Sequence, residues 1–176
     1  YNPCLNSKAY VESWIKENAA YWAEVLAKHA DIRIYLENMF DKTPDVLEGI
    51  SKQLQKYSNY GVCLDWAHVN VYGELHDEWL KSLYPYIKHI HINDNDYTAD
   101  THLPLGKGKI DWNEFMEHYY KSFKDASVVI EMNHPDGQRE SLEYLKEWIL
   151  GKNKKLHNSK AEELLEKIFY YMNELT

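Results

Sequence analysis

Short apolar runs alternate with longer amphipathic segments along this 176-residue chain. The apolar runs are rich in β-branched residues and predict strands near residues 32–37, 61–65, 87–92 and 127–131. The longer segments carry apolar side chains at helical spacing and predict helices over residues 9–29, 43–57, 112–123 and 138–149. Strands that alternate with helices favour βαβ units and a parallel sheet. The pattern therefore predicts an α/β domain over residues 1–150.

The C-terminal segment has a different pattern. Residues 151–158 are polar and rich in lysine, which predicts a linker. Ser159 and Glu162 have the spacing of a capping box, and the residues after them form one apolar stripe, so we expect an amphipathic helix over residues 159–176. We expect this helix to pack on the surface of its own domain, with a contact between two copies of the chain as the alternative.

Charge and cysteine content narrow the function classes. The net charge is −8, from 28 acidic and 20 basic residues, and only Arg33 and Arg139 are arginines. Proteins that bind the nucleic-acid backbone usually present a basic, Arg-rich face, so nucleic acid is disfavoured as the main partner. The two cysteines are Cys4 and Cys63, and Cys63 lies in an apolar run, so we expect reduced thiols and a cytoplasmic protein. No apolar run is long enough to span a membrane, and nothing reads as a signal peptide, although the start at Tyr1 suggests that the true N-terminus is missing.

Ionisable side chains lie at the C-terminal end of every predicted strand, at Glu37, Asp65, His91 and Glu131. In parallel α/β sheets and barrels, this edge is where active sites are built. Each residue alone also fits a helix cap, a salt bridge or a core histidine. Three carboxylates that converge repel one another without a cation, and a mixture of carboxylates and imidazole favours a divalent ion such as Zn or Mn.

Five stretches of the chain carry a resemblance to a known family. They are residues 34–38 (IYLEN), 61–68 (GVCLDWAH), 90–94 (IHIND), 100–112 (DTHLPLGKGKIDW) and 128–131 (VVIE). In order and spacing they resemble the xylose isomerase-like TIM-barrel superfamily. That superfamily includes sugar phosphate isomerases and epimerases and the endonuclease IV type of abasic-site nucleases.

The resemblance implies that the predicted strands are the fifth to eighth of a (β/α)8 barrel, so that the chain is the C-terminal half of a TIM barrel with an extra C-terminal helix. A complete barrel needs about 250 residues. The first four strands are then truncated, contributed by a second copy in a homodimer, or supplied by another chain. Half a barrel exposes two strand edges, which must be covered to avoid aggregation.

The same resemblance implies a site and a reaction. Glu37, Asp65, His91 and Glu131 would hold one divalent metal, Mn or Zn, with Mg or Co as further options. Glu37 and Glu131 would exchange protons with an open-chain sugar or sugar phosphate through an enediolate, as in an isomerase or epimerase. Further along the chain, the expected ligands of a second metal, or contacts to substrate, are His68, Asp100 and His102.

The expected substrate contacts are Trp66, Asn93, Lys107 and His134. Trp66 would stack on the sugar ring, Lys107 would meet a phosphate or a distal hydroxyl, and His134 follows Glu131 in a turn at the barrel mouth. His89 and His91 share a face if their strand is regular, in which case His89 lines the barrel floor.

The sequence is also compatible with two other functions. One is a zinc-dependent abasic-site nuclease of the endonuclease IV type. Against it stand the acidic composition, Trp66-Ala67 in place of the small Thr-Cys pair of that branch, and Thr101 in place of its arginine. The other is an inactive fragment that keeps the ligands and binds metal weakly.

Overall fold

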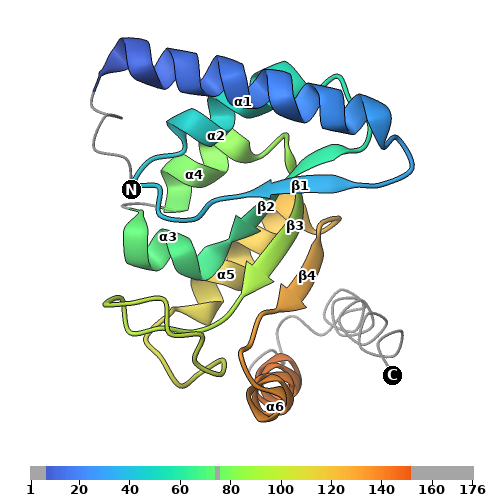
Figure 1. Cartoon of the computed structure of the whole chain (residues 1–176). Helices are drawn as coiled ribbons and strands as arrows, with labels where there is room; N and C mark the ends of the chain where they lie inside the picture. The colour runs from blue at the N-terminus through green and yellow to red at the C-terminus, as the bar shows by residue number, and fades with distance from the viewer. Residues whose placement is uncertain (1–6, 74–75, 152–176) are drawn as a thin grey trace.

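Four parallel strands form the centre of the molecule, in a computed structural model that describes residues 7–73 and 76–151 (Figure 1). The order in the sheet follows the chain, and the strands are β1 (Ile34–Glu37), β2 (Tyr60–Asp65), β3 (Ile87–Ile92) and β4 (Ser127–Ile130). The predicted α/β class and parallel sheet are confirmed. This arrangement is consistent with part of a TIM barrel.

Helices connect each strand to the next, as parallel pairing requires. β1 and β2 are connected by α2 (Asp45–Leu54), and β2 and β3 by α3 (Trp66–Tyr72) and α4 (His76–Leu83). β3 and β4 are connected by α5 (Trp112–His118), which continues into the π-helical turn η2 (Tyr119–Phe123). In addition, α1 (Lys8–Lys28) precedes β1, and α6 (Pro135–Gly151) follows β4. The predicted linker starts at Gly151, which instead ends α6. The rest of that linker and the predicted helix over residues 159–176 lie outside the described residues.

Residues 66–83 contain two helices, α3 and α4, that the hydrophobic pattern did not predict. They have seven and eight residues, so each offers too few turns for a clear helical period. The start of α3 is set by a cap, because Asp65 Oδ1 accepts a hydrogen bond of 2.7 Å from the backbone N–H of His68. The C-terminal residue of β2 therefore also starts the next helix.

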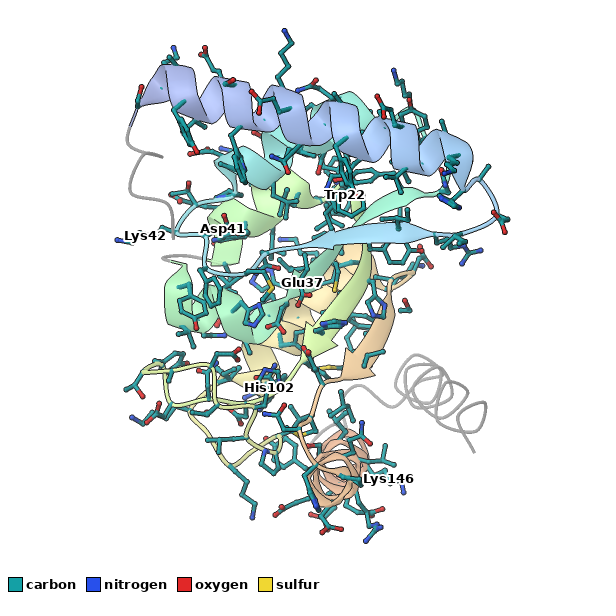
Figure 2. The ribbon with its side chains drawn as sticks, viewed as in Figure 1. Trp22, Glu37, Asp41, Lys42, His102 and Lys146 are labelled. Carbon is teal, nitrogen blue, oxygen red and sulfur yellow. The ribbon has the colours of Figure 1, made fainter. Side chains whose placement is uncertain are left out.

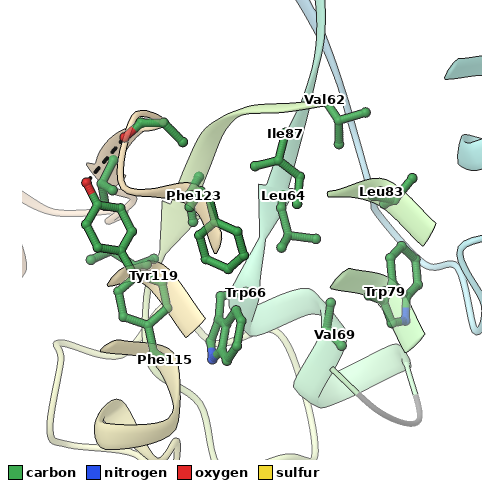
Figure 3. Close-up of a cluster of buried hydrophobic side chains, with 14 of the residues drawn as sticks. Val62, Leu64, Trp66, Val69, Trp79, Leu83, Ile87, Phe115, Tyr119 and Phe123 are labelled. Atoms are coloured by element: carbon green, nitrogen blue, oxygen red, sulfur yellow. Dashed lines mark hydrogen bonds between the residues drawn. The ribbon is translucent and has the colours of Figure 1, made fainter. Parts of the chain in front are cut away.

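The two faces of the sheet differ in chemistry, because side chains alternate along each strand. On one face the strands pack against helices, and we call it the helix-covered face; its central residues are Val62, Leu64 and Ile90. Figure 3 shows part of this core, in which strand residues pack with Trp66, Val69, Trp79, Leu83, Phe115, Tyr119 and Phe123. The other, polar face carries Tyr35, Glu37, Cys63, Asp65, His89 and His91.

A β-bulge in β3 adjusts this alternation. Val62 pairs with Ile87, but Cys63 pairs with His89, so β3 has one extra residue, Lys88, at this point. The bulge allows Ile87 to be buried in the core and places His89 beside His91, with ring centroids 5.0 Å apart. Both histidines therefore lie on the polar face, as a regular strand from His89 onward predicts.

The outer strands keep one unpaired edge each within the described ranges. β1 pairs with β2 alone and β4 with β3 alone. Among residues 7–73 and 76–151, no helix combines the length and the apolar character needed to cross a lipid bilayer.

Candidate metal and substrate site

Four strand ends bring Glu37, Asp65, His91 and Glu131 together on the polar face. One donor atom from each lies within 4.8 Å of the others, and we call this set the four-ligand cluster. His91 is at its centre, with Nδ1 3.1 Å from Glu37 Oε1 and 3.0 Å from Glu131 Oε2. Glu131 follows β4 directly and continues the sheet through a hydrogen bond of its N–H to the carbonyl of Ile92. The structure thus brings together the four predicted metal ligands.

Asp65 is the deepest member of this cluster. Its side chain is 0 % exposed, and burial raises its pKa to about 7, with the charges of Glu131 and Glu37 acting in the same direction. The charge of His68 and the hydrogen bond from its N–H act in the opposite direction. A buried carboxylate next to two others is costly to ionise, and a nearby cation removes that cost.

His91 and Glu131 form a strongly coupled pair. The hydrogen bond from His91 lowers the pKa of Glu131 to about 2. Burial opposes the charge on His91, but its hydrogen bonds with Cys63, Glu131 and Glu37 prevail and raise its pKa to about 12. With Asp65, whose donor atom also lies within 4.8 Å, three carboxylates surround one imidazole. This donor set fits a divalent ion such as Mn²⁺ or Zn²⁺, which would take the place of the imidazole proton as the counter-charge.

A second group of donors consists of His68, Asp100 and His102, and one ligand atom from each again lies within 4.8 Å of the others. The Nε2 atoms of both histidines lie 3.2 Å from Asp100 Oδ2. His68 Nδ1 lies 2.7 Å from the carbonyl oxygen of Asn38, and His102 Nδ1 lies 3.2 Å from that of Glu131. A ring whose Nδ1 donates to a carbonyl has Nε2 free to bind a metal, so this triad also suits an ion.

His68 joins the two groups. Its Nδ1 is 3.8 Å from Glu37 Oε1, and its Nε2 is 3.9 Å from Asp65 Oδ2. Burial lowers the pKa of His68, but the charge of Asp65, the carbonyl of Asn38 and Asp100 raise it above its usual value overall. The two groups therefore form one continuous site. Figure 2 labels a residue of each, Glu37 at the end of β1 and His102 on the loop after β3.

The loop that carries Asp100 and His102 is organised by Asp94, whose role the sequence did not reveal. Asp94 Oδ1 accepts hydrogen bonds from the N–H groups of Asn95 (2.9 Å) and Ile110 (3.2 Å). Its Oδ2 accepts from the N–H of Gly106 (2.8 Å) and from the indole of Trp112 (3.1 Å). A Cβ on Gly108 would clash with Asp94 Oδ1, so only glycine fits at position 108. The glycines of this loop are the signal that could have pointed to it.

The four predicted substrate contacts fall in different places. Asn93 is buried at the cluster, and its Nδ2 lies 3.4 Å from Asp65 Oδ2. Lys107 is mostly exposed and pairs with Glu140 at 2.8 Å. His134 is exposed in the turn before α6.

Trp66 corrects the expectation that its ring would stack on a sugar. The side chain is 0 % exposed and stacks on His76 at 3.9 Å between ring centroids, with Phe115 against its edge. Trp66 begins α3 directly after Asp65, and its ring lies in the hydrophobic core with Leu64 and Phe115 (Figure 3).

A family model described as "Xylose isomerase-like TIM barrel" matches residues 5–148 of the chain. The chain is 30% identical to the uncharacterized protein MJ1311 of Methanocaldococcus jannaschii over 165 residues, which cover 88% of this chain and 56% of that protein. It is 32% identical to a probable endonuclease 4 of Protochlamydia amoebophila over 91 residues, 43% of this chain and 31% of that protein.

Two solved structures resemble the fold. A D-tagatose 3-epimerase-like protein matches with a TM-score of 0.69 and 28% identity, over 85% of this chain and 59% of that chain. The TTHB071 protein of Thermus thermophilus, from a crystal soaked with zinc chloride, matches with a TM-score of 0.57 and 28% identity, over 77% of this chain and 54% of that chain. The chain thus spans little more than half the length of its longest matches.

Proposed function

The chain belongs to the xylose isomerase-like TIM-barrel family, and from this premise we propose that it is a metal-dependent isomerase or epimerase of sugars or sugar phosphates. One observation carries the proposal. Glu37 and Glu131 both lie close to His91 Nδ1, at 3.1 Å and 3.0 Å, within a cluster that fits a divalent ion. The resemblance to a D-tagatose 3-epimerase-like protein supports the sugar as substrate.

The ion would be held by Glu37, Asp65, His91 and Glu131, and Mn²⁺ or Zn²⁺ fits these donors best. When bound, such an ion supplies Lewis-acid polarisation of a substrate carbonyl. Asp65 and His91 would hold the site in shape, because Asp65 is anchored by the N–H of His68 and His91 is fixed between two carboxylates.

Proton transfer is the task of the two glutamates. Carboxylates on opposite sides of a substrate carbon can act as general base and general acid, one removing the proton beside the carbonyl and the other returning a proton to the enediolate. Return to the same carbon from the opposite side inverts it, and return to the neighbouring carbon interconverts aldose and ketose. His68 is placed between Glu37 and Asp65 and could orient a substrate hydroxyl.

The proposal includes the rest of a barrel. We infer that β1 to β4 are strands five to eight, because the motifs at their C-terminal ends resemble those of the last four strands in this family. The matches cover only a little over half of the longer relatives, which agrees with a half-barrel. The unpaired edges of β1 and β4 would then pair with strands one to four, which come from a longer chain or from a second half-barrel. These strands would close the polar face around the substrate.

Deuterium exchange tests the proposed chemistry directly. The protein, loaded with Mn²⁺ or Zn²⁺, is incubated in D₂O with a panel of ketoses, aldoses and their phosphates, and deuterium at the carbon beside the carbonyl is followed by NMR. We expect exchange with at least one sugar, and its loss in Glu37→Gln and in Glu131→Gln. Glu117→Gln, an exposed change on α5, is the matched control and should keep the activity. Bound metal without exchange from any sugar would instead support the inactive metal-binding fragment.

A second candidate function is a zinc-dependent nuclease for abasic DNA. The triad of His68, Asp100 and His102 favours it, because it adds a second donor group next to the first, and part of the chain is similar to a probable endonuclease 4. Clustered zinc ions activate water for attack on phosphate esters. Two or more zinc ions per chain, together with nicking of an abasic-site duplex, would favour this function over the isomerase.

A further inference from the structure

The polar face carries a second layer of polar side chains beneath the four-ligand cluster. Two residues before Asp65 and His91 on their strands lie Cys63 and His89, which are paired in the sheet register. Ser127 is the partner of His89 on β4, and its Oγ lies 2.6 Å from His89 Nδ1. The interior layers of TIM barrels are usually filled by branched apolar residues. This layer of the sheet instead contains a thiol, an imidazole and a hydroxyl, which are groups that can bind a ligand or an ion.

We propose that Cys63, His89 and His91 form a distinct site for a thiophilic divalent ion, such as Zn²⁺ or Cd²⁺, and that this ion and the ion of the four-ligand cluster exclude each other. One ligand atom from each of these residues lies within 4.8 Å of the other two. The proposal does not depend on the isomerase function. It concerns which ions the polar face can hold.

The donor chemistry separates the two sites. One thiol and two imidazoles suit soft or borderline ions, whereas three carboxylates and one imidazole also suit harder ions such as Mn²⁺. Binding at the thiol site would release the Cys63 proton to the buffer, because the thiolate is the ligand. The hydrogen bond between His89 Nδ1 and Ser127 Oγ holds that ring in one orientation, which is the usual role of a partner behind a metal-binding imidazole.

His91 is the residue that both sites need. Its Nδ1 is within 3.1 Å of Glu37 and of Glu131, while Cys63 also forms a hydrogen bond with the same side chain. An ion held by Cys63 and His89 would draw the imidazole away from the carboxylates. The four-ligand cluster would then retain only its three carboxylates, so a thiophilic ion at the lower site weakens binding at the upper one.

Cadmium titration of the metal-free full chain tests the proposal. A Cd²⁺ ion bound by a thiolate absorbs in the near ultraviolet, and the chain has only two cysteines. We expect a charge-transfer band with one Cd²⁺ per chain that is lost in Cys63→Ser and kept in Cys4→Ser, the matched control. We expect His89→Gln to keep the thiol but to weaken apparent Cd²⁺ affinity about tenfold or more. Retention of the band in Cys63→Ser, or its loss in Cys4→Ser, would overturn the assignment.

Competition tests the mutual exclusion. Saturation with Mn²⁺ should weaken apparent Cd²⁺ affinity in the wild-type chain, and Glu37→Gln should reduce this competition by weakening the Mn²⁺ site. Circular dichroism of every variant shows whether it is folded. If Cys63→Ser does not fold, His89→Gln provides the test of the site. Cadmium binding that is the same in His89→Gln and in wild type would overturn the site. Cadmium binding that is indifferent to Mn²⁺ would overturn the shared use of His91.

Discussion

The two faces of the four-stranded sheet are built from alternate residues of the same strands, but burial has opposite effects on stability on the two faces. On the helix-covered face, Val62, Leu64 and Ile90 are 0 % exposed, and their burial stabilises the fold. On the polar face, Asp65 is equally buried but is a carboxylate whose pKa burial raises to about 7. One face therefore contributes stability, and the other holds groups whose burial costs stability unless a cation joins them.

This difference suggests a division of labour. Changes on the helix-covered face should alter the free energy of unfolding and leave metal binding intact. Changes on the polar face should weaken metal binding and should not destabilise the metal-free fold. Four experiments test this separation, in order of the size of the effect.

The largest effect is expected for Leu64→Ala on the helix-covered face. Truncation of a fully buried leucine leaves a cavity, and we expect a loss of about 2–5 kcal/mol in the free energy of unfolding. Urea denaturation measures that loss, and elemental analysis should still find the wild-type content of Mn or Zn. A variant that is folded but has lost its metal would show that the two faces are not independent.

The second experiment changes the polar face and leaves the helix-covered face intact, with the substitution Asp65→Asn. Asparagine keeps a side-chain oxygen for the N–H of His68, so the cap of α3 survives while the charge is removed. Because the buried charge costs stability without a cation, we expect the metal-free variant to be at least as stable as the metal-free wild type. Addition of Mn²⁺ at a hundredfold excess over Kd should stabilise the wild-type chain by roughly 2.7 kcal/mol and leave the variant unchanged.

Thermal unfolding with and without Mn²⁺ measures this effect. Asp125→Asn, an exposed change before β4, is the control and should respond to the ion as the wild type does. An Asp65→Asn chain that gains as much stability from Mn²⁺ as the wild type would remove Asp65 from the ligand set.

The residues of this comparison also show how far the sequence alone can predict the structure. The strands were predictable, because apolar runs recur at a regular spacing, and four ionisable residues at the ends of parallel strands were expected at one edge of the sheet. Their donor atoms lie within 4.8 Å of one another, which also needs a sheet that curves as in a barrel. The positions of these four candidate ligands follow from topology more than from detailed packing. They could therefore be predicted without coordinates.

Other features depend on contacts that the sequence does not encode locally. Trp66 follows a metal-ligand candidate but turns into the core, because α3 begins at that residue and its ring stacks on His76. The bulge at Lys88 depends on the register between β2 and β3. Asp94 is one carboxylate among many in the sequence, and only the folded loop brings four donors to it.

Asp94 also offers the third experiment, because it supports one part of the polar site without being a ligand. Asp94→Asn replaces an oxygen by an amide group that cannot accept hydrogen bonds, so buried N–H donors lose their partner, at a cost of about 1–3 kcal/mol. We expect faster proteolysis within residues 95–110 and loss of the donor group formed by Asp100 and His102 with His68. The four-ligand cluster should still bind one ion.

Limited proteolysis and metal stoichiometry together measure this outcome. Asp96→Asn is the control, because Asp96 lies in the same loop but is only half-buried, and its carboxylate accepts hydrogen bonds from the N–H and the hydroxyl of Thr98 within its own turn. An intact loop in Asp94→Asn would mean that the main-chain hydrogen bonds between Asp94 and Leu103 suffice to hold it.

The smallest effect concerns the pH dependence of the helix-covered side. His76 stacks on Trp66, and burial lowers its pKa, although Glu114 acts in the opposite direction. The pKa of His76 in the folded state lies below its value of about 6.5 in the unfolded chain. Between these two pH values, the unfolded chain therefore binds more protons than the folded chain. The stability that neutral His76 allows is thus present above about pH 6.5 and is lost as the pH falls below it.

His76→Gln should therefore flatten the decline in stability of the metal-free chain between pH 7.5 and pH 5. Urea denaturation of the wild type and the variant at each pH gives the difference in their free energies of unfolding. The contributions of the polar-face histidines cancel in this difference, because both chains contain them. Parallel curves would mean that Glu114 compensates the burial of His76. In that case, the pH response of the molecule would belong to the polar face alone, and the contrast between the two faces would be sharper than the structure suggests.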